Sequence, residues 1–456
     1  MFANRIEELK SIKDALASKK PEFIVIYGRR RVGKTELLKQ ILKIRSDAIY
    51  FLGRDESPHD MLARLSSIVA DKYNDEKLIR FPFKNLDEAF YYFAQKRNAV
   101  LIFDEFPYMA SSEPALLSVM QGFCDSEMKN TKLKLFACGS SVGMVERSLL
   151  GHSTPLYGRR TRQLKIEPMR FSAVKAFFPK MNFLELLEIY AVLGGTPAYL
   201  LEFEKNLFTT IDKKFLKKDQ FLYKDAEFIL REELKEPRYY FSIIRSIAFG
   251  NTSLGRIMND SGLSKDVVSK YLAVLQDLGV VERLWPVTEN PKSRKGIYRI
   301  KDNYFKFYFR FIFPNLEYIE IGETDFLLEK IKENFNSYLG IIFEDVLLEI
   351  FRERKDLFPF KPTKLGRWWG KEREIDIIAI DEKYDEILFA EAKYTQKKVG
   401  SDLYFDLIEK SKEVKWRNKT RKEHYMIVSK SGFERNLKDK NVKCLGLNAI
   451  YQFQAE

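Results

Sequence analysis

The chain has 456 residues, of which 45% are hydrophobic and 14% aromatic, so its length and composition indicate roughly two to four folded domains and exclude a disordered chain. Lys and Arg number 78 against 65 Asp and Glu, a formal charge of +13, which suits a polyanionic partner but indicates none by itself. Three scattered cysteines and three histidines argue against disulfides, a zinc site and histidine-based catalysis; with no membrane-length apolar run and no secretory signal, a cytoplasmic protein is expected.

The first 205 residues alternate short apolar runs with helical patterns. Such alternation predicts an α/β fold with a parallel sheet and helices on both of its faces. The strands are expected at Glu22–Tyr27, Asp47–Leu52, Ala99–Phe103, Leu133–Cys138 and Gln163–Ile166.

A phosphate-binding loop is predicted where the first of these strands ends. Residues 28–35 match G-x-x-x-x-G-K-[ST], a strand precedes them, and a helical pattern follows. Backbone N–H groups of such a loop face phosphates, while Lys34 would reach the β- and γ-phosphates and Thr35 would ligate Mg²⁺. The predicted ATP-binding residues of the loop are Gly28, Arg29, Arg30, Arg31, Val32, Gly33, Lys34 and Thr35.

Two later strands end in polar residues that suit the same site. Asp104 would hold Mg²⁺ and Glu105 would polarise the attacking water, although an acidic pair after a strand is often only a solvated turn. Ser140 and Ser141 follow the next strand. Their hydroxyls would lie beside the γ-phosphate, or else would cap the helix that follows.

Several short motifs in residues 1–230 together resemble the prokaryotic "archaeal ATPase" family, on the AAA+/STAND side of the P-loop NTPases. They are 2–9 (FANRIEEL), Asp104-Glu105, 139–141 (GSS), 157–160 (YGRR) and 194–199 (GGTPAY). The resemblance implies that Arg5 lies near the adenine and that Pro197 packs on the nucleotide from a lid. It also implies that Arg159 or Arg160 senses the γ-phosphate, in cis or from a neighbouring copy; a solvated basic turn is the alternative.

Helical periodicity dominates residues 206–320, which are predicted as a helical lid and a winged helix. Two amphipathic helices surround the turn at Gly262, and strands at Val280–Trp285 and Gly296–Ile300 would form the wing. The residues expected to face DNA are Lys265, Ser269, Lys270, Lys292, Arg294 and Lys295. A hinge or protein-contact module is the alternative.

Residues 325–456 carry carboxylates inside apolar runs. Glu344 lies on a predicted helix over Tyr338–Arg354, Asp376 lies on a strand over Glu374–Ile380, and Glu391 and Lys393 end a strand over Ile387–Ala392. The three carboxylates are predicted to bind Mg²⁺, with Glu391 and Lys393 as catalytic groups. A charged edge hairpin is the alternative, although a buried carboxylate without a partner costs several kcal/mol.

The order E…D…E-x-K resembles the PD-(D/E)xK nuclease-like superfamily, although Arg373 and Glu374 precede Asp376 where Pro-Asp would be expected. A basic segment at 410–422 could lie along a DNA backbone or form a solvated helix face. The fold class predicted for the whole chain is thus a P-loop NTPase sheet with a helical lid, a winged helix and a C-terminal α/β restriction-endonuclease-like domain.

The sequence therefore predicts an ATP- and Mg²⁺-dependent ATPase that associates with DNA. An ATP-driven signalling switch with an inert C-terminal domain is the alternative, in which ATP drives the assembly of a homo-oligomer. A transcription regulator that uses only the winged helix is a third.

Overall fold

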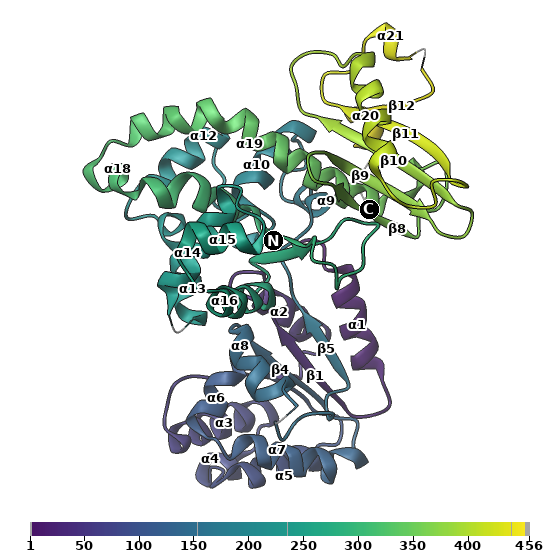
Figure 1. Cartoon of the computed structure of the whole chain (residues 1–456). Coiled ribbons are helices and arrows are strands. Elements are labelled where there is room, and N and C mark those ends of the chain that lie inside the picture. The colour runs from purple at the N-terminus through teal and green to yellow at the C-terminus, as the bar shows by residue number, and fades with distance from the viewer. Residues whose placement is uncertain (1, 153, 235, 439, 452–456) are drawn as a thin grey trace. The chain divides into compact units, whose positions relative to one another are not determined.

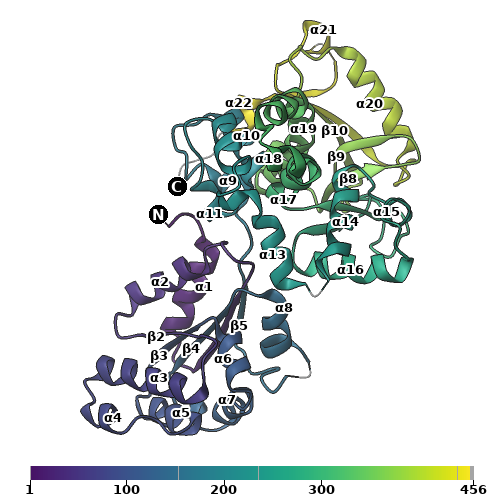
Figure 2. The same ribbon diagram turned by 90° about the vertical axis from the view of Figure 1, so that its left-hand side faces the viewer.

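The computed structural model describes residues 2–152, 154–234, 236–438 and 440–451. The chain folds as two compact units (Figures 1 and 2), of which the first contains Met1–Pro168, Thr196–Ala198 and Ile229–Lys235 and the second contains Met169–Gly195, Tyr199–Phe228 and Glu236–Glu456. No helix among the described residues is both long and apolar enough to cross a membrane.

The first unit is built on a sheet of five parallel strands in the order β2-β3-β4-β1-β5. This confirms the parallel α/β sheet predicted from the sequence, with each strand within a few residues of its expected place. The strands are β1 (Glu22–Tyr27), β2 (Ile49–Leu52), β3 (Val100–Asp104), β4 (Lys134–Gly139) and β5 (Arg162–Lys165).

Helices cover the sheet because alternate strand residues point to opposite faces. Ile24 and Ile26 of β1 pack in one buried cluster with apolar residues of α1 (Ile6–Ala17) and α2 (Lys34–Ile44). The ring of Phe103 on β3 makes an edge-to-face contact with Phe90 of α5 (Leu86–Gln95). The other helices of this unit are α3 (Pro58–Tyr73), α4 (Glu76–Arg80), α6 (Phe106–Ser112), α7 (Leu116–Asp125) and α8 (Val142–Val145).

The second unit begins with helices that pack around an aromatic core. Helix α10 (Phe183–Leu193) packs against α17 (Asn303–Phe307) and the long α19 (Thr324–Glu353). The boundaries that the sequence predicts near residues 205 and 320 stay predictions. The smaller helices of this part are α9 (Phe171–Val174), α12 (Leu207–Thr210) and α18 (Leu316–Ile321), whereas α11 (Pro197–Leu200) and α13 (Asp225–Glu233) each contain residues of both units.

Residues 237–300 form three helices followed by a two-stranded antiparallel hairpin. Ser253 caps the second helix by accepting a hydrogen bond from Arg256 N at 3.3 Å. Gly262, at φ 68°, supplies the left-handed turn into the third helix. The elements are α14 (Pro237–Ala248), α15 (Leu254–Ser261), α16 (Lys265–Asp277), β6 (Val281–Leu284) and β7 (Ile297–Ile300).

The C-terminal part holds a mixed five-stranded sheet in the order β12-β11-β10-β9-β8. Strands β8, β9 and β10 are antiparallel, whereas β10, β11 and β12 are parallel, with α20 (Ser401–Glu413) between β10 and β11. The two edge strands, β8 and β12, were not predicted from the sequence, because they are short and partly exposed and contain no continuous apolar run. The strands are β8 (Lys364–Trp369), β9 (Glu374–Asp381), β10 (Glu386–Lys393), β11 (Lys422–Ser429) and β12 (Lys443–Gly446); α21 (Arg435–Lys438) and α22 (Leu447–Ile450) follow β11 and β12.

Candidate functional site

The loop between β1 and α2 has a backbone that only glycine adopts easily. Gly28 has φ 153°, and a Cβ there would lie 2.2 Å from the carbonyl oxygen of Ile166. Gly33 has φ 96° at the N-terminus of α2. The loop therefore wraps tightly before the helix, and its N–H groups together with the helix dipole suit an anion.

Lys34 is folded into this loop with 5% of its surface exposed. Its Nζ donates to the carbonyl oxygens of Gly28 at 2.8 Å and Arg29 at 2.7 Å. Burial lowers the pKa of Lys34, and the nearby acidic groups, Asp104 and Glu105 among them, act in the opposite direction. An ammonium group held only by backbone carbonyls can turn to a phosphate without breaking an ion pair.

Asp104 stands opposite Thr35 at the end of β3. The Thr35 Oγ1 donates to Asp104 Oδ2 at 3.5 Å, and the Tyr50 hydroxyl donates to the same oxygen at 2.7 Å. A hydroxyl and a carboxylate that face each other are oxygen ligands of the kind Mg²⁺ takes at phosphate sites. These residues therefore fit the magnesium site that the motif predicts.

Glu105 is held by the strand next to its own. Its carboxylate accepts hydrogen bonds from the backbone N–H of Ser140 at 3.2 Å and from the Ser140 hydroxyl. Glu105 also has a left-handed backbone (φ 50°), a strained conformation that concentrates at functional sites. Ser141 caps α8 by accepting from Met144 N at 3.3 Å, as the helix-cap alternative expected.

The predicted arginines occupy different settings. Arg5 donates to the carbonyl oxygens of Val32 at 2.9 Å and Glu167 at 2.6 Å. It therefore links the phosphate loop to the segment that follows β5. Arg159 forms a two-pronged ion pair with Asp125, with 2.7 Å between Nη2 and Oδ2. Within the described residues, the buried Nη1 of Arg160 has no hydrogen-bond partner. Arg160 thus keeps a donor that a phosphate could take.

Three further predicted residues are Pro197, which lies beside the loop, and Arg30 and Arg31, which belong to it. A Cβ on Gly33 would lie 3.8 Å from Cγ of Pro197, so this proline reaches the loop as the lid interpretation expects. Arg30 pairs with Glu232 at 3.0 Å, and Arg31 has a left-handed backbone at φ 70°. The contact to Glu232 was not foreseen, because nothing in the sequence links a loop residue to one two hundred positions later.

The residues predicted to face DNA are exposed in the second unit. They lie on α16 (Lys265, Ser269 and Lys270) and on the loop between β6 and β7 (Lys292, Arg294 and Lys295). The hairpin is fixed at its base, because Val287 N donates to the Arg367 carbonyl at 2.8 Å and Trp369 Nε1 donates to the Lys295 carbonyl at 3.0 Å. The predicted wing therefore covers the edge of the C-terminal sheet.

The C-terminal carboxylates are brought close but are paired with cations. Glu391, with 1% of its surface exposed, binds Lys393 at 2.9 Å and Lys410 at 3.0 Å. Glu344 binds Arg367 at 2.6 Å. Asp376 accepts from Ala392 N at 2.9 Å, and burial, followed by the charge of Glu344, raises the pKa of Asp376.

In the predicted three-carboxylate metal site, Glu344 and Glu391 are each bound by cations. Throughout the described ranges, no group of three or more His, Cys, Asp or Glu side chains is arranged to hold a metal ion. Glu344 and Glu391 would have to leave these cations to bind Mg²⁺ together with Asp376, so the three-carboxylate site stays a prediction.

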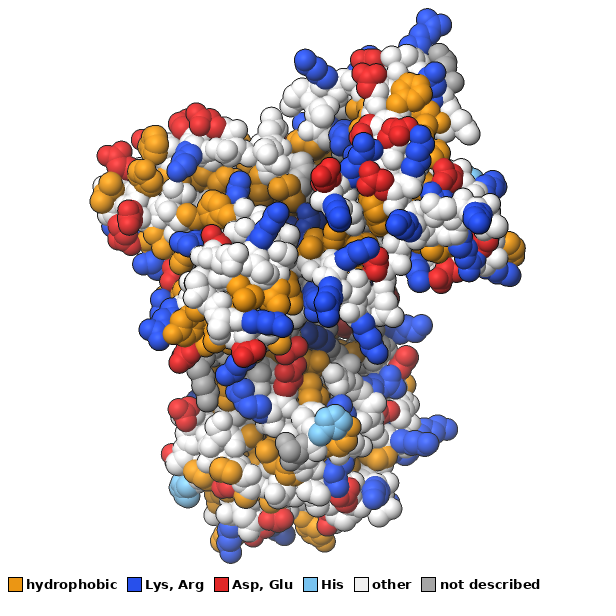
Figure 3. All heavy atoms as spheres, viewed as in Figure 1, with side chains coloured by type: hydrophobic (Ala, Val, Ile, Leu, Met, Phe, Trp, Pro, Cys, Tyr) orange, Lys and Arg blue, Asp and Glu red, His pale blue; other side chains and the backbone are white. Residues whose placement is uncertain are grey.

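Two cations of the basic segment at 410–422 turn inward, whereas the others are exposed: Lys412, Lys415, Arg417, Lys419 and Lys422. Lys410 turns inward to Glu391, and the Arg421 guanidinium donates to the carbonyls of Val414 and Ser411. Figure 3 shows acidic and basic side chains interspersed over the face that carries α20. A uniform positive strip for a DNA backbone is not formed there.

Comparisons with known proteins match two separate parts of the chain to two families. Residues 2–203 match a family described as an ATPase domain predominantly from Archaea, and residues 308–402 match a family described as archaeal and bacterial proteins of unknown function. A protein of Methanocaldococcus jannaschii, itself described as uncharacterised, is 40% identical over 418 residues, which cover 91% of this chain and 92% of that protein.

Two further likenesses are partial or distant. A second Methanocaldococcus jannaschii protein, described as an uncharacterised ATP-binding protein, is 45% identical over 53 residues, which cover 11% of this chain and 90% of its own length. The solved structure of a Walker-type ATPase of Pyrococcus abyssi has a TM-score of 0.49 and 20% identity. It covers 68% of this chain and 96% of its own.

Proposed function

Since the chain belongs to the predominantly archaeal family of P-loop ATPases, we propose that it hydrolyses ATP in the first unit and associates with DNA through the second. The observation that carries the first part is the hydrogen bond from Thr35 to Asp104, together with the buried Lys34 in the adjoining loop. The second part rests on the exposed basic residues of α16 and of the β6–β7 loop.

The residues of the first unit have complementary roles in this proposal. Lys34 leaves its two carbonyl partners and binds the β- and γ-phosphates. Thr35 and Asp104 hold Mg²⁺, which supplies charge neutralisation at the phosphates when bound. Glu105 accepts a hydrogen bond from the attacking water and orients it, while Ser140 fixes the carboxylate. Arg160 has the free donor for the charge that develops on the γ-phosphate.

The segment that leads from one unit to the next is attached to the nucleotide loop. Glu232 pairs with Arg30, and Glu233 accepts hydrogen bonds from the Ser141 hydroxyl at 2.9 Å and Val142 N at 3.2 Å. If Arg30 turns toward a phosphate, the pair to Glu232 is lost. The occupancy of the loop would thereby change how this segment is held, which supports a coupling of ATP to the second unit.

DNA association is tested with the full chain and a fluorescent duplex, in low and high salt. The double variant Lys265→Gln/Lys270→Gln is expected to bind several-fold more weakly at low salt and to show a shallower salt dependence, because each phosphate contact releases counterions. Lys39→Gln/Lys72→Gln removes the same charge from exposed positions of the first unit and serves as the control. Equal losses in both double variants would show only an effect of net charge.

The second candidate function is an ATP-driven signalling switch with a catalytically inert C-terminal domain. The pairing of Glu391 with two lysines and of Glu344 with Arg367 favours it. Incubation of the full chain with plasmid and Mg²⁺ or Mn²⁺, with and without ATP, separates the two. Cleavage that disappears in Asp376→Ala and Lys393→Ala would contradict the inert domain, and intact plasmid throughout would support it.

A further inference from the structure

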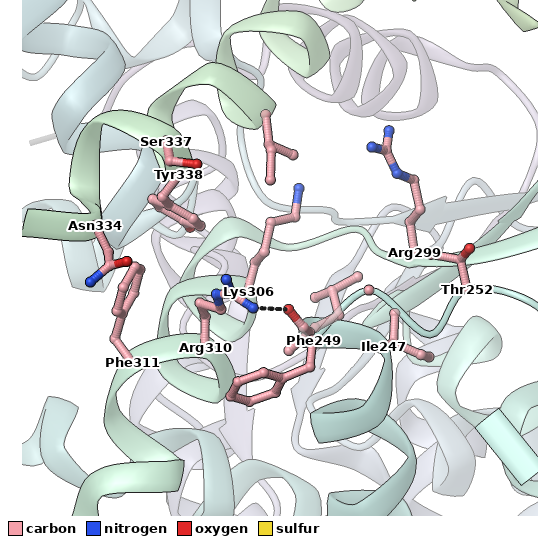
Figure 4. Close-up of a pocket in the computed structure, with 14 residues that line it drawn as sticks. Ile247, Phe249, Thr252, Arg299, Lys306, Arg310, Phe311, Asn334, Ser337 and Tyr338 are labelled. Atoms are coloured by element: carbon pink, nitrogen blue, oxygen red, sulfur yellow. Dashed lines mark hydrogen bonds between the residues drawn. The ribbon is translucent and has the colours of Figure 1, made fainter. Parts of the chain in front are cut away.

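The second unit contains a cavity of about 300 Å³, and none of the residues that line it has been assigned a role above. It lies where the end of α14 and the following loop meet β7, α17, the turn after it and α19. Figure 4 shows Asn334, Ser337 and Tyr338 of α19 on one side and Arg299 and Thr252 on the other, with Lys306 between them. A cavity of this size accommodates one small molecule.

The lining of the cavity is positively charged. Arg299, Lys306 and Arg310 contribute to it, and none of its described lining residues is acidic. Lys306 and Arg299 share one carboxylate, Asp345, at 2.7 and 3.3 Å. Arg310 is exposed and donates to the Ala248 carbonyl at 3.4 Å. Three cations around one small space favour an anion.

The neighbouring acids offset only part of this charge. Asp345 also binds Arg367 at 2.7 Å, and Arg367 binds Glu344 as well, so two carboxylates serve three cations. Burial acts to raise the pKa of Asp345, but these three cations hold it well below its usual range. Burial, followed by the charge of Asp345, raises the pKa of Glu282. Arg310 has no carboxylate among its described contacts.

The rest of the lining offers an apolar wall and neutral polar groups. Phe249 and Ile341 are 51% and 44% exposed, high values for large apolar side chains, and both line the cavity. The guanidinium carbon of Arg310 lies 4.9 Å from the Phe249 ring centroid. Asn334 and Ser337 add an amide and a hydroxyl. A planar ring that covers Phe249 would remove apolar surface from water.

We propose that this cavity binds a small phosphorylated molecule with a planar ring, in the class of a nucleoside monophosphate. Lys306 and Arg310 bind the phosphate by charge-assisted hydrogen bonds. The ring packs against Phe249, and Asn334 and Ser337 hydrogen-bond to the sugar or the ring edge. The site lies wholly in the second unit and does not depend on ATP hydrolysis in the first.

The test is calorimetric titration of the full chain with uridine monophosphate in the absence of other nucleotides, with Lys34→Ala in parallel to separate binding at the phosphate loop. Arg310→Gln is expected to weaken binding about tenfold or more, since it removes a charged hydrogen-bond donor. Ser337→Phe fills the cavity and is expected to abolish binding. Lys332→Gln, an exposed cation on α19 outside the cavity, is the matched control and should bind like the natural chain.

Inorganic phosphate and 5′-phosphorylated tetrathymidylate are titrated in parallel. No heat with uridine monophosphate, or equal affinity in Arg310→Gln, Ser337→Phe and the natural chain, would overturn the proposal. Equal affinity for inorganic phosphate would overturn the role of the ring. Tighter binding of the oligonucleotide would assign the cavity to nucleic acid ends and would also overturn it.

Discussion

The phosphate loop of the first unit and the carboxylate cluster of the second were both predicted from short motifs, but the structure treats them differently. Among the described residues, the Lys34 ammonium donates to two backbone carbonyls and to no carboxylate, so it can turn to a ligand. Glu391, equally buried, is already bound by Lys393 and Lys410. A contiguous motif defines its own backbone geometry, whereas a motif assembled from separate elements also depends on the charges that other elements bring. The four predictions below test this difference.

The largest effect is expected at the phosphate loop. Lys34→Ala should lower the rate of ATP hydrolysis by about a thousandfold, because the cation predicted to bind the β- and γ-phosphates is lost. Steady-state phosphate release measures this. Lys39→Ala on the exposed face of the same helix should retain the rate; a similar loss there, or none in Lys34→Ala, would contradict the site.

A somewhat smaller effect is expected at Glu105. Glu105→Gln should lower the turnover about a hundredfold and leave ATP binding intact, because the amide still fits beside Ser140 but orients water poorly. Binding of a fluorescent ATP analogue and single-turnover hydrolysis separate the two steps. Loss of binding together with turnover would assign Glu105 a structural role.

Substitution of Arg160 and substitution of Arg159 should give rates of ATP hydrolysis that differ by about tenfold. Arg160→Gln is expected to slow hydrolysis about tenfold or more, because its buried nitrogen is the available donor. Arg159→Gln breaks the pair with Asp125 and should change turnover little. Mixing each variant with the natural chain shows whether the arginine acts within its own subunit. The reverse order of effects would exchange their roles.

The smallest effect concerns stability at the carboxylate cluster. The pKa of Asp376 is raised in the folded state, so its contribution to stability is present below its ordinary pKa and is lost as pH rises through the raised value. Asp376→Asn keeps an acceptor for Ala392 N and removes this loss. Its Tm relative to the natural chain should therefore rise by roughly 2–4 °C between pH 4 and pH 7. A constant difference would contradict the raised pKa.

The sequence was informative where neighbouring residues suffice. The five strands of the first sheet, the glycine-rich loop and the hairpin of residues 281–300 follow from local periodicity and turn residues. The edge strands β8 and β12 and the contact between Arg30 and Glu232 did not follow. They depend on packing between positions far apart in the chain, for which one sequence carries no signal.

By itself, the sequence determined that a phosphate loop follows a buried strand, that Asp104 and Glu105 end a neighbouring strand, and that Asp376, Glu391 and Lys393 share a sheet. Only the tertiary structure decided which of these side chains remain available. Arg367 and Lys410 neutralise Glu344 and Glu391, and Asp345 is shared by three cations beside a cavity that no motif marks. The reason is that charge pairing acts through space, over a few ångströms, between side chains that the chain order keeps apart.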